Sequence, residues 1–378
     1  MRFVGDRRSE LLGYNQNESE SASEHQTFCN LPRISIRDAC CEMGTWSDLR
    51  EGRFLDGDCQ SDPIAPKWLV QRKYKRGQQL LNENVFAVMF CHLGGLVMLV
   101  NISSIYYPLE KTGNSTTLVS AFQRYLHTLT HVLSWYETDV FEESSEGFKS
   151  LKHVRRLHRK AASMMTLHRA PLREGEKWIS QYDMALTQFA FIGMMIIHPE
   201  VLGFSHLSEE DRLAICHFWR CIGHLLGISD QYNLFDSEDL HVIEKICRSI
   251  EAEVFIPSLT ANWREGHRMG KTIMESSTKN IIHFMTYNGI MKYWSEVVAI
   301  RFMVPMTCTD WFYFYLIKAT LKTRLLGIQC IRRSFNQLLH HAIGKAPKRA
   351  TSVYKTLCIR DNQGGVQIKG CPFAAAIC

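Results

Sequence analysis

Apolar residues recur at helical spacing over most of this sequence, and no other feature limits the possible folds as strongly. Within 118–136, for example, Leu118, Phe122 and Leu126 are four residues apart and share one helix face. The alternating apolar and polar pattern of strands is nearly absent. The other helical segments are 150–168, 183–197, 209–228, 238–255, 271–286 and 310–330. The pattern predicts an all-α protein with a single large multi-helix domain.

The two ends of the chain differ in composition from this helical part. Residues 1–62 are rich in Ser, Glu, Asn and Asp, and the stretch 15–24 cannot bury enough apolar surface to offset its ordering entropy. We therefore predict a disordered or loosely ordered leader over 1–62 and a helical domain over 63–340. Basic residues and a Gly-Gly pair predict a loosely held tail over 341–378.

The segment 85–100 raises the question of a membrane span. It has one His and no charged residue. At about 1.5 Å of rise per residue it is roughly 24 Å long as a helix, shorter than the ~30 Å hydrocarbon core of a bilayer. The segment therefore favours a buried core helix over a membrane anchor.

Charge and cysteine usage exclude several classes of protein. Lys and Arg total 44 and Asp and Glu total 38, a net charge of +6 over 378 residues. We take this small excess to be spread along the chain, which gives no case for nucleic-acid binding. Thirteen cysteines cannot all pair within one chain, and they lack the dense spacing of a secreted disulfide scaffold. The first 21 residues contain no apolar signal-peptide core. We expect a cytoplasmic or peripherally membrane-associated protein with free thiols.

Two motif-like segments do not fit the chemistry that they suggest. The stretch 266–272 resembles a phosphate-binding loop, but three residues separate its glycines where four are needed, and no strand precedes it. Cys216, His217, Cys221 and His224 lie close together as zinc ligands would. Structural zinc sites usually draw on two separated pairs of ligands, so buried thiols and hydrogen-bonded histidines are the preferred interpretation.

Polar residues on the segments 118–136 and 150–168 carry more information. Arg124, His127, Thr128 and His131 form a polar stripe on the first segment, which is either an exposed face or one wall of a site. On the second segment, His158 falls on the apolar stripe. A histidine in such a place is more often a hydrogen-bonded core residue than a ligand, and spacing alone leaves both interpretations open.

Four segments of the sequence resemble a known protein family. The segments 124–128, 154–158, 179–189 and 217–230, in this order, look like the catalytic domain shared by the bacterial rubber oxygenases (latex clearing proteins) and the ER-bound fungal oxygenase of mycophenolic acid biosynthesis. The resemblance extends over roughly residues 65–300 and is strongest to sequences of the animal branch.

The resemblance implies an all-helical domain enclosing a pocket for haem b and an apolar substrate, with O₂ as co-substrate. By motif, Arg124 and Thr128 match the Arg and Thr of the distal, oxygen-binding side, and His158 matches the proximal iron ligand. His127 stands where rubber oxygenases have a Lys. Glu110 is the nearest candidate for their catalytic acid, while Asp183 and Asp230 match family positions for which we expect structural roles.

These observations favour a haem-dependent oxygenase, an oxidoreductase acting on an apolar substrate for which the resemblance suggests an isoprenoid C=C bond. Peripheral contact with a membrane is compatible with this activity. One alternative is a non-catalytic helical binding protein that has kept the fold and lost the iron. Another is a non-haem metalloprotein that uses His153, His158 and further histidines.

Overall fold

The computed structural model describes residues 44–168, 172–261, 264–278 and 285–363, and within them the chain is helical. Apart from one isolated bridge between Asp56 and Ser180, these residues contain no β-structure, which confirms the all-α class. The helices are α1 Gly44–Glu51, α2 Gln71–Glu83, α3 Val85–Leu99, α4 Ser103–Lys111, α5 Leu118–Glu137, α6 Glu146–Met165, α7 Gln181–Gln188, α8 Met194–Ile197, α9 Glu209–Leu225, α10 Leu240–Ile250, α11 Ile256–Thr260, α12 Arg264–Thr278, α13 Tyr287–Val297, α14 Cys308–Lys322 and α15 Gln329–Gln363.

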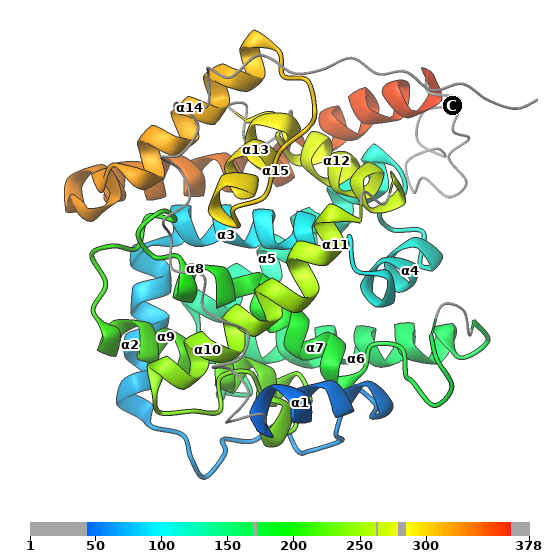
Figure 1. Cartoon of the computed structure of the whole chain (residues 1–378), viewed down its shortest axis with the longest axis vertical. Helices are drawn as coiled ribbons and strands as arrows, with labels where there is room; N and C mark the ends of the chain where they lie inside the picture. Colours follow the sequence, from blue (N-terminus) through cyan, green and yellow to red (C-terminus); the bar gives the residue numbers. More distant parts are fainter. Residues whose placement is uncertain (1–43, 169–171, 262–263, 279–284, 364–378) are drawn as a thin grey trace, which may run out of the picture. The chain divides into compact units, whose positions relative to one another are not determined.

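Helix α3 is the centre of the hydrophobic core, as its uncharged sequence predicts. Most of its residues are buried, and helices pack against it from several sides (Figure 1). Two adjacent glycines allow this close approach. A side chain at Gly94 would overlap the indole ring of Trp294, and one at Gly95 would overlap the carbonyl oxygen of Ala190. The segment 85–100 is therefore a core helix.

Polar caps fix where the other helices begin. Ser208 accepts a hydrogen bond from the backbone of Asp211 at the start of α9, where the sequence predicts a helix start. Capping boxes begin α5 at Thr117, α7 at Ser180 and α14 at Thr307. In each case a side chain satisfies a backbone N–H that the first helical turn leaves unpaired.

Two helices that the sequence predicts to be continuous are each interrupted by a π-helical turn. The turn η3 (Phe189–Gly193) separates α7 from α8, and η5 (Glu251–Phe255) separates α10 from α11. The rings of Phe189 and Phe255 are in contact, with centroids 4.7 Å apart. Apolar periodicity does not distinguish an α turn from a π turn, so the sequence gives no sign of these interruptions.

Residues 44–62, which the sequence assigns to the leader, are part of the described structure. Leu49 of α1 is buried in the main core. A backbone hydrogen bond holds the extended segment that follows α1. The amide of Cys59 donates to the carbonyl of Gly227 at 2.8 Å. Long-range contacts of this kind have no local sequence signal. Residues 1–43 lie outside the described residues.

At the other end, α15 continues through residues 341–363, where we expected a loosely held tail. Its first half packs on the domain through Leu339, which is buried. The carboxamide of Asn336 also donates to the backbone carbonyl of Glu83 at 2.8 Å. The remaining residues of the expected tail, 364–378, lie outside the described residues.

Within the described ranges, no single helix has the length and apolar composition needed to cross a bilayer. Only α2 and α3 taken together meet that requirement, and they are bent by 88° relative to each other.

Candidate functional site

Helices α5 and α6 form an antiparallel pair that carries all four of the predicted site residues. Polar contacts near the end of the pair where the chain passes from α5 to α6 fix the register of the two helices. The hydroxyl of Ser150 accepts a hydrogen bond from the indole N–H of Trp135 at 2.8 Å and lies 2.8 Å from Nδ1 of His131. This register brings the position of His158 on α6 toward that of Arg124 on α5.

His158 lies in an environment that suits a neutral imidazole. Its Nδ1 is buried and has no hydrogen-bond partner within the described part of the chain. Burial and, to a smaller extent, the charge of Arg124 lower the pKa of His158, the carboxylate of Asp58 partly opposes them, and the net value is about 4. A histidine in this state has an unprotonated ring nitrogen available at neutral pH.

The structure brings Arg124 within electrostatic range of His158 but directs the other two residues elsewhere. The Arg124 guanidinium donates to the hydroxyl of Thr112 at 3.3 Å. The Thr128 hydroxyl donates to the Arg124 carbonyl at 3.0 Å, a bond within its own helix. His127 is exposed to solvent.

A pocket of about 500 Å³ opens beside His158. Its wall is mixed in character, with apolar surface from side chains such as Trp178 and Leu226 and charged groups such as Arg159 and Lys177. This cavity therefore combines apolar and charged groups, and that it is the expected pocket for haem and an apolar substrate stays a prediction. Arg124 and Thr128 are not among the residues that line it.

A second cavity of about 360 Å³ shares Leu172, Glu176 and Lys177 with the first. Its wall includes Asp183, which is buried and serves as the N3 residue of the α7 capping box. The Ser104 hydroxyl also donates to Asp183 at 2.7 Å. These contacts give Asp183 the structural role that we expected.

An ion pair that has no local sequence signal borders the His158 pocket through Asp58. Arg155 is buried on α6 and donates two hydrogen bonds to the carboxylate of Asp58, at 2.9 and 2.5 Å. The exposed Arg159 adds a third contact with the same carboxylate at 3.2 Å. Asp58 comes from the extended segment 55–70, which we call the strap. Arg155 and Asp58 are 97 residues apart, so no local motif connects them.

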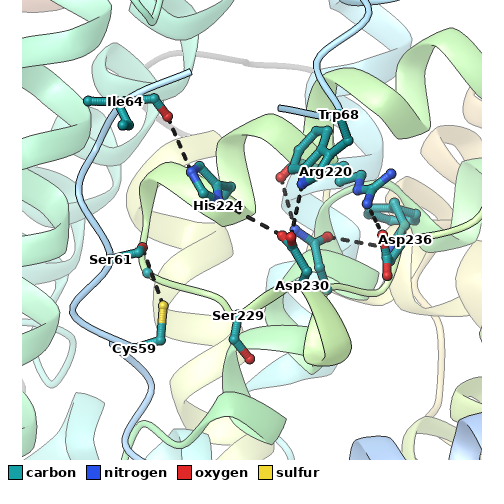
Figure 2. A network of polar contacts seen from close by, with 12 residues as sticks. Cys59, Ser61, Ile64, Trp68, Arg220, His224, Ser229, Asp230 and Asp236 are labelled. Atoms are coloured by element: carbon teal, nitrogen blue, oxygen red, sulfur yellow. Dashed lines mark hydrogen bonds and ion pairs between the residues drawn. The ribbon is translucent and has the colours of Figure 1, made fainter. Parts of the chain in front are cut away.

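The other end of the strap is fastened to α9 (Figure 2). The Trp68 indole N–H donates to Asp230 at 3.0 Å, and the guanidinium of Arg220 lies 3.9 Å from the centroid of the Trp68 ring. Nε2 of His224 lies 3.2 Å from the carbonyl oxygen of Ile64. Asp230 therefore anchors the strap, which is a structural role.

The cysteines and histidines that resembled a zinc site all lie on α9, where they do not form a group that could hold a metal ion. Cys216 and Cys221 are buried free thiols, and Nε2 of His217 accepts the amide N–H of Val70 at 3.1 Å. Within the described residues, no group of three or more His, Cys, Asp or Glu side chains is placed to hold a metal ion. The stretch that resembled a phosphate loop lies inside α12. Glu110, the candidate acid, lies on α4 and pairs with Lys111 at 3.4 Å.

The buried pair gives a testable prediction for stability. Asp58→Asn should lower the free energy of unfolding at pH 7 by about 3–5 kcal/mol, because it leaves the buried Arg155 guanidinium without a compensating charge. Denaturant unfolding measures this change. Asp56→Asn is the matched control, since Asp56 is exposed and its 3.9 Å pair with Lys177 should contribute less than about 1 kcal/mol.

The same pair predicts a pH dependence. Burial alone would raise the pKa of Asp58, but hydrogen bonds from Arg155 and the Gln60 amide, with the charge of Arg159, lower it below the usual value of 3.8. The stabilisation is therefore complete above about pH 5 and is lost as the pH falls through the folded-state pKa. The difference between wild type and Asp58→Asn should shrink below about pH 4. A constant difference down to pH 2 would show that the charge of Asp58 is not its cause.

Comparison with known proteins identifies the domain that carries these residues. Residues 84–303 match the family model described as "ER-bound oxygenase mpaB/B'/Rubber oxygenase, catalytic domain". The matched range contains Arg124, Thr128 and His158 but not the strap. No curated protein and no solved structure matches the chain.

Proposed function

Because the chain belongs to the family of the ER-bound oxygenase mpaB/B' and rubber oxygenase catalytic domain, we propose that it is a haem-dependent oxygenase. Family membership gives an oxygenase, and therefore an oxidoreductase that uses O₂. The proposal adds haem b as the cofactor and an apolar substrate with an isoprenoid C=C bond as the group attacked. The observation that carries it is the state of His158.

The surroundings of His158 fit a residue that would hold haem iron as a ligand. Such a ligand must be a neutral imidazole held in a fixed direction, and His158 is neutral at physiological pH and lies on a long helix. Its side chain lines the 500 Å³ pocket. Arg159 and Lys177 line the same pocket, where they pair with Asp58 and Asp56, and they would exchange these partners for the two carboxylates of haem b. When bound, haem supplies the centre at which O₂ is activated.

Arg124 does not line the pocket, but the family motif assigns it to that chemistry and its charge acts on His158. Its guanidinium keeps its positive charge at all physiological pH values, so it can stabilise negative charge that develops on the oxygen side. The Thr128 hydroxyl already donates its proton to the backbone carbonyl of Arg124. It can therefore only accept a further hydrogen bond. His127 is exposed, and we assign it no contact with the cofactor.

A non-catalytic binding protein is the second candidate function, and one observation favours it. The side chains of Arg124 and Thr128 both have partners inside the protein, Thr112 for the first and a backbone carbonyl for the second. A protein that had lost its cofactor could keep both side chains hydrogen-bonded in this way.

Haem titration of the purified full-length chain separates the two functions. We expect binding at one haem per chain with a sharp Soret band. Because the pKa of His158 is about 4, the band should persist as the pH falls to about 5 and be lost as the imidazole becomes protonated. Absence of saturable haem binding would support the binding protein. Metal analysis of the same sample would reveal a non-haem metalloprotein.

A further inference from the structure

Helix α14 has apolar side chains on both of its sides, but only one side is buried. Phe314, Ile317 and Leu321 point into the domain and are at most 4% exposed. The opposite side carries large apolar residues that remain in solvent. Trp311, Phe312, Tyr315 and Leu316 are 40%, 62%, 59% and 41% exposed.

These four residues form one continuous surface, which we call the α14 face. Positions 311 and 315 are four residues apart, as are 312 and 316, so each pair is stacked along the helix. The rings of Trp311 and Tyr315 are stacked with centroids 5.8 Å apart. Soluble proteins expose single apolar residues routinely, whereas a contiguous aromatic surface usually marks an interaction site. In Figure 1, α14 is the orange helix beside α13, at the edge of the drawn domain.

Positive charge is concentrated in the same part of the chain. Residues 301–363 contain 11 Lys and Arg but only two acidic residues, Asp310 and Asp361. Asp310 is buried in the α14 capping box. The assumption that the net charge of +6 is spread evenly along the sequence is therefore wrong. Such asymmetry is typical of proteins that bind an anionic surface.

Several of these cations are free to meet an external anion. Lys318 pairs with Glu296 and Arg324 with Glu200. In contrast, Arg301, Lys322 and Arg333 are exposed and make no ion pair with any residue that the structure describes. Lys322 is 11 residues, or about three helical turns, after Trp311, so it extends the α14 face.

We infer that the α14 face docks onto the surface of a lipid bilayer that contains anionic phospholipids. Trp and Tyr side chains favour the boundary between headgroups and acyl chains, while Lys and Arg reach the phosphates. At 15 residues, α14 is too short to span a bilayer and would lie parallel to its plane. Lys322, which makes no ion pair among the described residues, extends this aromatic surface and favours an anionic bilayer, because lysine is attracted to the lipid phosphates. The inference does not depend on the proposed oxygenase function.

Sedimentation of the full-length chain with vesicles tests the inference. The probes are vesicles of phosphatidylcholine alone and of phosphatidylcholine with phosphatidylserine. We expect binding that saturates with lipid, is tighter on the anionic vesicles and weakens as salt screens the charges. No detectable binding of the folded protein to either vesicle would overturn the inference.

Variants assign the binding to the α14 face. Phe312→Glu should weaken vesicle binding by about 10- to 100-fold, because it removes one inserted aromatic ring. Lys322→Glu should weaken binding to anionic vesicles by at least about fivefold and leave binding to phosphatidylcholine nearly unchanged. Val242→Glu is the control. Val242 is 37% exposed on α10 and is not part of the α14 face, so its variant should bind as wild type does.

Two further outcomes would contradict the inference. Equal vesicle binding by wild type and Phe312→Glu would place the membrane contact elsewhere in the chain. Concentration-dependent dimerisation that Phe312→Glu abolishes, without vesicle binding by wild type, would show that the α14 face binds a second copy instead. Circular dichroism of each variant checks that the helices remain formed.

Discussion

His158→Ala should abolish haem binding and with it the Soret band, while the far-UV spectrum of the protein stays helical. The imidazole would hold the iron directly, so its loss would remove that attachment. The fold should tolerate the change for two reasons. Nδ1 of His158 has no hydrogen-bond partner among the described residues, so no buried group is left unpaired, and alanine is the strongest helix former.

A second histidine on α6 provides the matched control. His153 is exposed and lies 3.1 Å from the guanidinium of Arg156. His153→Ala should bind haem with the wild-type spectrum, which would also exclude the metalloprotein that uses both histidines. Added imidazole should restore a Soret band to His158→Ala by filling the space of the lost ring. An unchanged spectrum in His158→Ala without imidazole would contradict the assignment.

The sequence predicts the helices well because their signals are local. The range 118–136 corresponds to α5 at Leu118–Glu137, and 209–228 to α9 at Glu209–Leu225. In both cases an apolar stripe and a cap residue a few positions away determine the helix. The central position of α3 also follows from its own sequence, because a helix without a polar face must be covered on all sides.

Features that depend on long-range contacts could not be predicted in the same way. Asp58 lies in a stretch whose composition resembles the disordered leader, and contacts with residues far away in the sequence, such as Arg155 and Gly227, hold the stretch in place. Arg155 itself looks like one basic residue among several on α6. Its burial could have been suspected only from the helix face that it shares with the apolar residue Leu151.

For the candidate site, the sequence predicts which helices meet but not how each side chain is engaged. The family motif selects Arg124, Thr128 and His158, and the structure brings Arg124 and His158 within electrostatic range. The motif does not reveal that Thr128 bonds its own helix or that His127 faces solvent. The rotamer and the hydrogen-bond partner of each side chain depend on neighbouring segments, such as the C-cap of α4, where Thr112 accepts a hydrogen bond from Arg124.

Arg124→Ala should retain haem but slow the consumption of O₂ with a short isoprenoid oligomer by about 10²–10³-fold. This is the loss expected when one preorganised donor to a developing negative charge is removed. The same variant should raise the pKa of His158, because it removes a cation that disfavours the charged imidazole. Titration of the His158 ring by NMR in the haem-free protein measures this second effect without any substrate.

Two variants separate the charge of Arg124 from its position. Arg124→Lys keeps the cation but lacks the planar fork, so the pKa of His158 should stay close to about 4 while O₂ consumption falls. Thr112→Val removes only the hydroxyl that accepts from Arg124, and we expect a smaller loss of rate because the guanidinium is retained but less well oriented. If Arg124→Ala consumed O₂ at the wild-type rate and left the pKa of His158 unchanged, Arg124 would be a structural residue of the α4–α5 contact. The developing charge would then have to be stabilised by another group.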